Sequence, residues 1–170
     1  MPPYFWGKHI STRNLGPLTL APQVKRDNDH MEKTPICTYC TLSESRIIDQ
    51  SPLTLVIRDV FPVSPGHTLI IPRRHVDSYF DLTDQEREDM TFMMTRAKDS
   101  LKKELSPQAF NIGINEGFAA GQTVAHINMH LIPRFKGDVA EPRGGIRWLF
   151  PEKAIFWDKK SAPVTTTTEK

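Results

Sequence analysis

The chain has 170 residues and a formal net charge of +2, with 22 Lys and Arg against 20 Asp and Glu. This even balance argues against a broad basic surface for nucleic acid or for a membrane. With only two cysteines, a disulfide framework is excluded, and Cys37 and Cys40 are left for a metal site, a redox pair or no special role. The length is sufficient for one domain with its own buried core.

Apolar runs in the sequence are short. The longest, 53–57 and 68–71, have the length of strands and fall far short of the about 18 residues of a membrane span. The first residues lack the basic start, apolar run and small-residue cleavage site of a secretory signal. Free thiols with CxxC spacing agree with a reducing compartment. We therefore expect a soluble cytoplasmic protein with no membrane partner and no nucleic-acid partner.

Periodic segments occupy the middle of the chain. Residues 1–34 are rich in proline and show little periodicity, which predicts an irregular N-terminal arm. Residues 161–170 are predicted to form a disordered tail. Strands are predicted at 53–57 and 67–72, and the prolines and glycine of 61–66 favour a chain reversal between them.

A long helix is predicted after this hairpin. Thr83 and Glu86 have the spacing of a capping box, and apolar residues then recur at helical spacing to about residue 105. Two further strands are predicted at 111–115 and 123–135. The order strand, strand, helix, strand, strand indicates an α+β fold: a mainly antiparallel sheet with the long amphipathic helix packed on it.

The last predicted strand holds the most informative residues. Side chains alternate between the faces of a strand, so His126, Asn128 and His130 should share one face. The apolar residues between them should pack against the helix. A row of ring and amide groups needs hydrogen-bond partners, which an anion, a metal ion or a nucleotide phosphate would supply. A solvated polar face is the alternative.

These residues resemble the motif of the histidine-triad (HIT) superfamily of nucleotide hydrolases and transferases. The family motif is His-x-His-x-His after Gly-Gln-Ser/Thr, and here Gly-Gln-Thr at 121–123 precedes His126, Asn128 and His130. Further similar segments are Arg58-Asp59, 62–67, 73–75, 80–83 and 115–117. We therefore expect residues 35–136 to form a HIT domain with a HIT-like fold. Residues 142–153 resemble a zinc-containing bacterial branch described as diadenosine polyphosphate hydrolases.

The resemblance implies a reaction in two steps. The middle histidine attacks the α-phosphorus of a nucleotide, and water or another acceptor then releases the nucleoside monophosphate. By position, Asp59 binds the ribose hydroxyls, and His130 binds the α-phosphate with His67 behind it. The phosphates or the leaving group are held by Asn115, Gln122 and Thr123. His130 and Gln122 are the catalytic candidates beside the nucleophile position.

The nucleophile position is occupied by Asn128. The lone pair of an amide nitrogen is delocalised, so no phosphoramidate can form through it. The chain is therefore expected to bind nucleotide and to fail to turn it over. Three explanations remain open: an engineered trap of an active enzyme, a natural binding protein or nucleotide sensor, and catalysis by another group such as His130.

The resemblance also implies a structural zinc site. In part of the superfamily, a CxxC pair binds zinc together with a histidine after the second strand and the first triad histidine. The matching residues are Cys37, Cys40, His75 and His126, and two thiolates with two imidazoles suit closed tetrahedral zinc. No thioredoxin-like pattern surrounds the cysteines, which disfavours a redox pair. A bare structural pair is the other alternative.

The leading hypothesis is a nucleotide hydrolase acting at the α-phosphate of dinucleoside polyphosphates or related nucleotide conjugates. A non-catalytic nucleotide sensor and a nucleotidyl transferase or phosphorylase are the alternatives. Because family members are commonly homodimers, a homodimer is expected. Residues 137–160 should either complete the site or lie at the dimer interface.

Overall fold

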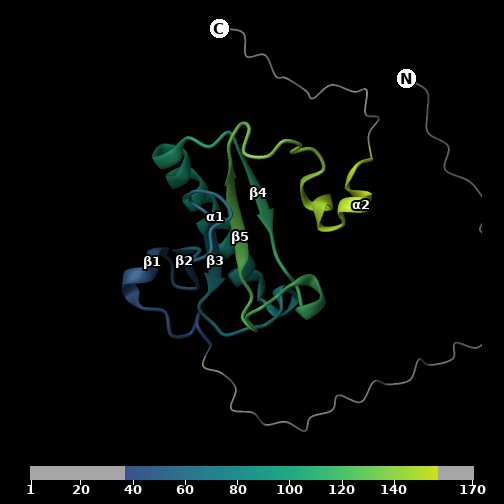
Figure 1. Ribbon diagram of the computed structural model, residues 1–170. Coiled ribbons are helices and arrows are strands. Elements are labelled where there is room, and N and C mark those ends of the chain that lie inside the picture. The colour runs from purple at the N-terminus through teal and green to yellow at the C-terminus, as the bar shows by residue number, and fades with distance from the viewer. Residues whose placement is uncertain (1–36, 157–170) are drawn as a thin grey trace, which may run out of the picture. The chain divides into compact units, whose positions relative to one another are not determined.

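The computed structural model describes residues 37–156 (Figure 1). Within them, five strands form one antiparallel sheet in the order β1-β2-β3-β5-β4. The strands are β1 (Ile47–Gln50), β2 (Thr54–Arg58), β3 (Thr68–Pro72), β4 (Ala109–Gly113) and β5 (Met129–Arg134). The helices are α1 (Asp84–Leu105), which lies across one face of the sheet, and the short α2 (Pro151–Ala154). This arrangement is the predicted α+β fold.

Helix α1 begins at the predicted capping box. The Glu86 N–H donates to Thr83 Oγ1 at 3.2 Å, and the Thr83 N–H donates to the Glu86 carboxylate at 2.8 Å. One face of the helix is buried and packs on apolar side chains of β2, β3 and β5, including Val56, Ile70 and Leu131. The buried helix residues are Met90, Met93, Ala97 and Leu101. The methionines are therefore core contacts.

The opposite face of the sheet is covered only in part. Over β2 and β3, the chain before and at the start of β1 packs on it through Tyr39, Leu42 and Ile47. Along β5, alternate residues are buried toward α1, which turns His130 and Ile132 to the opposite face. The sheet face that bears His130 is therefore the one on which a site can form.

Strand β5 is shorter than predicted. It begins at Met129, and residues 123–128, which we expected to belong to the strand, form a loop. The backbone leaves the ladder because the Ile127 N–H donates to the Val76 carbonyl at 2.8 Å. The expectation that His126, Asn128 and His130 line up on one strand face is wrong, since only His130 lies in the strand.

Two other differences from the prediction exceed the one-residue shifts of β2 and β3. Strand β1 was not predicted, and β4 begins and ends two residues before the predicted strand at 111–115. The predicted arm at 1–34 and tail at 161–170 lie outside the described residues. Within residues 37–156, no helix combines the length and the apolar character needed to cross a bilayer.

Candidate functional site

The four predicted metal ligands lie together. Cys37 and Cys40 precede β1 in the chain, His75 follows β3, and His126 lies in the loop before β5. The Cys37 Sγ atom is 3.4 Å from His126 Nδ1, and Cys40 Sγ is 3.3 Å from His75 Nδ1 and 3.6 Å from His126 Nδ1. All four donor atoms lie within 4.8 Å of one another.

These distances fit a tetrahedral zinc site. Zinc bonds of about 2.3 Å to sulfur and about 2.0 Å to nitrogen place the two ligand atoms about 3.6 Å apart. Both rings turn Nδ1 inward, while His126 Nε2 bonds the Pro72 carbonyl at 2.9 Å and His75 Nε2 lies 3.7 Å from the Asp77 carboxylate. Such outer partners orient metal-binding imidazoles. The two thiols and two imidazoles are therefore the residues that would hold zinc.

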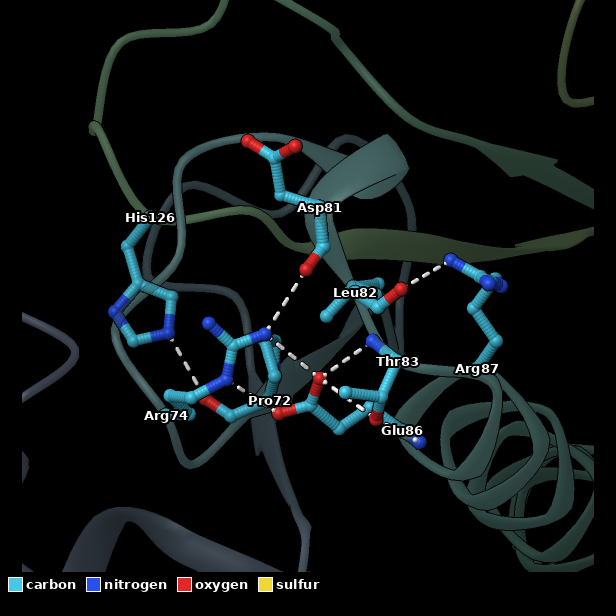
Figure 2. A network of polar contacts seen from close by, with 8 residues as sticks. All are labelled: Pro72, Arg74, Asp81, Leu82, Thr83, Glu86, Arg87 and His126. Carbon is cyan, nitrogen blue, oxygen red and sulfur yellow. Dashed lines mark hydrogen bonds and ion pairs between the residues drawn. The ribbon is translucent and has the colours of Figure 1, made fainter.

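An ion pair ties the chain beside this cluster to the start of α1 (Figure 2). Arg74 Nε and Nη2 each donate to one Glu86 carboxylate oxygen at 2.8 Å, and Nη2 also donates to the Asp81 carbonyl at 3.0 Å. The Glu86 side chain is 7% exposed. Its hydrogen bonds from Arg74 are the main cause that lowers the pKa of Glu86 to about 2. The segment from Pro72 to His75 is thus fixed to the helix.

Three further predicted site residues form a second cluster, made of Asp59, His67 and His130. His67 Nε2 lies 3.0 Å from His130 Nδ1, and the Asp59 carboxylate lies 3.4 Å from His67 Nδ1. The Val63 N–H also donates to His67 Nδ1, at 3.4 Å. Burial lowers the pKa of both histidines. Both rings are therefore neutral at neutral pH and can share a single hydrogen bond.

Asn128 lies between the two clusters in the chain. Its Nδ2 donates to the backbone carbonyl of His126 at 3.3 Å. The side chain is half-buried, one residue before β5 and two residues before His130. His126 therefore holds the Asn128 amide through its backbone carbonyl, while its ring faces the two cysteines. Through His126, the cluster of cysteines and histidines is connected to the predicted nucleophile position.

The other predicted residues lie between β4 and β5. Gln122 Nε2 donates to the carbonyls of Asp77 at 2.8 Å and Val124 at 3.1 Å, and its Oε1 accepts from the Gly117 N–H at 2.7 Å. These bonds engage both ends of the amide in holding the loop, and the predicted contact of Gln122 with phosphate stays a prediction. Two predicted phosphate ligands are exposed on this loop: Asn115 and Thr123.

Comparison with known proteins shows which family this chain resembles. The HIT domain model matches residues 41–137. The bis(5'-nucleosyl)-tetraphosphatase (asymmetrical) of Schizosaccharomyces pombe is 38% identical over 97 residues, covering 57% of this chain and 53% of that protein. The AP-4-A phosphorylase of Mycobacterium tuberculosis is 32% identical over 96 residues, covering 56% of this chain and 49% of that protein. The chain thus spans about half the length of these two relatives.

Solved structures agree with the fold. A Zn-bound histidine triad family protein from Mycobacterium smegmatis superimposes with a TM-score of 0.58 at 32% identity, covering 62% of this chain and 80% of that one. A HIT family protein from Bacillus anthracis gives a TM-score of 0.57 at 30% identity, covering 61% and 77%. Because the family model matches more than half of the chain and the fold agrees, the protein belongs to the HIT domain family.

Proposed function

We propose that the chain carries the site of a nucleotide hydrolase. Its substrates are dinucleoside polyphosphates of the diadenosine polyphosphate type or related nucleotide conjugates, attacked at the α-phosphate. With Asn128 at the nucleophile position, the chain binds such a substrate without turning it over. The observation that supports this most directly is the Asn128 amide held by the His126 carbonyl, two residues before His130, whose ring pairs with that of His67.

The reaction of a chain with histidine at position 128 has two displacements. An imidazole nitrogen attacks the α-phosphorus, so that a P–N bond forms and the P–O bond to the leaving phosphate chain breaks. Water then attacks the same phosphorus, the P–N bond breaks, and the nucleoside monophosphate leaves. The Asn128 nitrogen shares its lone pair with the amide carbonyl, so the first bond does not form.

His130 is assigned to the α-phosphate because its hydrogen-bond chain leaves a donor free. In the tautomer that the Val63 N–H favours by donating to His67 Nδ1, the His67 proton is on Nε2 and is donated to His130 Nδ1. The His130 proton is then on Nε2. A neutral donor fixed in this way stabilises charge that develops on phosphate oxygens.

The remaining roles follow the family motif. Asp59 is assigned to the ribose hydroxyls; the phosphates or the leaving group are assigned to Asn115, Gln122 and Thr123. Zinc held by Cys37, Cys40, His75 and His126 is assigned a structural role, and the reduced thiols that this requires agree with a cytoplasmic location.

A homodimer is part of the proposal. Within the described residues, β4 pairs only with β5, so its outer edge is open, and Ile112 on this strand is 52% exposed. An open edge of this kind is a ready site for pairing with a second copy. Residues 137–156 would then border the interface, which is one of the two roles expected from the sequence for 137–160. Sedimentation of the purified chain tests this: a monomer at micromolar concentration contradicts it.

The deciding experiment for the activity is Asn128→His, assayed on diadenosine polyphosphates, nucleoside phosphoramidates and adenylyl sulfate. We expect turnover at least roughly 10³-fold above that of the unmodified chain, because a nucleophile is restored. A histidine variant that cleaves none of these compounds contradicts the hydrolase.

Two alternatives give other results in the same assay. A nucleotide sensor, which Asn128 favours, binds tightly and gains no activity from Asn128→His. A phosphorylase, which the name of the mycobacterial relative supports, releases product only when inorganic phosphate is added.

A further inference from the structure

A pocket of about 910 Å³ lies between the sheet and the C-terminal part of the described chain. Strands β4 and β5 line it through Asn111, Gly113, Ile132 and Arg134. Residues 138–149 contribute another wall, which includes the indole of Trp148. None of the residues assigned above to the reaction lines this pocket, so the reaction leaves it unused, although Ile112 and residues 138–149 also border the proposed dimer interface.

The pocket adjoins the reaction site on the same sheet face. Gly113 is paired with His130 across the two strands, and Asn111 is paired with Ile132. Ile132 shares the face of His130 and follows it by two residues, about 6.5–7 Å along the strand. Val63 lines the pocket and also donates its N–H to His67, the partner of His130. One end of the pocket is therefore next to the His67–His130 pair.

There is open space at Gly113, between the two places. A Cβ added at Gly113 would meet no atom within 4 Å, so the space beside this residue, opposite His130, is open. A phosphate chain bound at His130 can pass through this space. The apolar cover formed by Tyr39 and Leu42 lies over β2 and β3, on the other side of β5 from the pocket.

The chemistry of the lining favours a neutral group over a phosphate. The charge of Arg134 is compensated, because its guanidinium donates to Asp138 at 2.7 and 2.8 Å and to Asn111 Oδ1 at 2.5 Å. The remaining wall is mainly apolar, and the Trp148 N–H is directed to the Arg143 carbonyl at 2.9 Å, which fixes the indole. The volume is typical of a small-molecule site.

We propose that this pocket binds the second nucleoside of a two-ended substrate, the one that leaves with the phosphate chain. The inference rests on the proposed function and adds to it a recognition site for the leaving group. A purine with its ribose is neutral, flat and partly apolar, and an indole is a suitable surface for stacking. Dinucleoside polyphosphates are then preferred over mononucleotides with the same number of phosphates.

The unmodified chain permits a direct binding test, because Asn128 prevents turnover. We would titrate it calorimetrically with diadenosine tetraphosphate and with adenosine 5′-tetraphosphate, which has the same phosphates and one nucleoside. We expect the two-ended ligand to bind at least about tenfold more tightly, since stacking of one base is worth this much or more. Equal affinities overturn the inference and leave the proposed function intact, whereas binding of neither ligand overturns the proposed function itself.

Two variants locate the effect. Trp148→Ala should remove most of the difference between the two ligands while the affinity for adenosine 5′-tetraphosphate stays the same. Phe150→Ala is the matched control, because Phe150 is an exposed aromatic residue of the same segment and does not line the pocket. Equal effects of both variants overturn the inference. Sedimentation shows whether Trp148→Ala keeps the oligomeric state of the unmodified chain. If the difference between the two ligands is lost only together with a change of that state, the pocket is an interface between copies and the inference is overturned.

Discussion

His126 and His130 stand four residues apart and belong to different clusters, because the chain enters β5 between them. The His126 ring faces the two cysteines and is 1% exposed, whereas the His130 ring meets His67. Asn128 joins the two through its bond to the His126 carbonyl. At the scale of single residues, the motif therefore separates into one member of the cysteine–histidine cluster, one amide held by the backbone between the clusters, and one member of the His67 pair.

This separation predicts opposite losses for two matched substitutions. His126→Asn should lose most of the bound zinc, because it removes one of four ligands. His130→Asn should keep about one zinc per chain and lose about 10- to 100-fold in nucleotide affinity, because it removes a hydrogen bond to a charged group. Metal analysis and calorimetry measure both. Loss of zinc in His130→Asn would contradict the assignment.

At the scale of elements, the ion pair of Arg74 and Glu86 connects α1 to the metal cluster. Arg74 directly precedes His75, and the carbonyl of Pro72 holds the ring of His126. Both histidine ligands are therefore positioned by a short segment that Glu86 fixes to the first turn of the helix, as Figure 2 shows for the side of His126. Partners of this kind tune metal affinity without touching the metal.

Glu86→Gln should therefore weaken zinc binding by about 10-fold or more, beyond its effect on stability. Glu104→Gln is the matched control: Glu104 also lies on α1 and pairs with an arginine, Arg58, at 2.6 Å, but it is in the last turns of the helix rather than the first. We expect Glu104→Gln to leave the zinc Kd unchanged. If both variants shift the Kd equally, Glu86 supports the fold only.

The same pair predicts how stability depends on pH. The pKa of Glu86 is lowered in the folded chain from the usual 4.5 to about 2. The contribution of the Glu86 carboxylate to the free energy of unfolding is therefore complete above about pH 5 and is lost as the pH falls from 4.5 toward 2. Because Arg74 is half-exposed, solvent screening reduces this contribution to about 1–2 kcal/mol. In metal-free samples, the free energies of unfolding of the unmodified chain and of Glu86→Gln should differ at pH 6 and converge near pH 2. A difference that stays constant with pH would contradict this.

For the whole molecule, sequence patterns predicted correctly those elements whose position depends only on neighbouring residues. The start and length of α1 follow from its cap and its helical spacing. The beginning of β5 does not follow from such a pattern. The apolar alternation continues back to Ile127, whose backbone N–H bonds the Val76 carbonyl instead of a neighbouring strand. The metal ligands could be named from the family motif, but the pairing of Arg74 with Glu86 depends on a turn whose direction no local pattern specifies. Strand β1 was missed because it is a short edge strand with polar residues.

The cluster of Cys37, Cys40, His75 and His126 and the His67–His130 pair are joined through Asn128. On the proposed assignment, removing zinc should therefore affect both. Chelation leaves the cluster of two cysteines and two histidines without its central bonds, and we expect a fall in Tm of about 10 °C, equivalent to about 3 kcal/mol. The His126 ring then loses one of its two anchors, and the Asn128 amide, which bonds the carbonyl of the same residue, loses its fixed position.

Nucleotide affinity should therefore fall severalfold in the metal-free chain and recover when zinc is added back. Calorimetry with diadenosine tetraphosphate, at a temperature where circular dichroism shows the metal-free chain to be folded, measures this coupling. An affinity that is the same with and without zinc would mean that the strand alone fixes position 128.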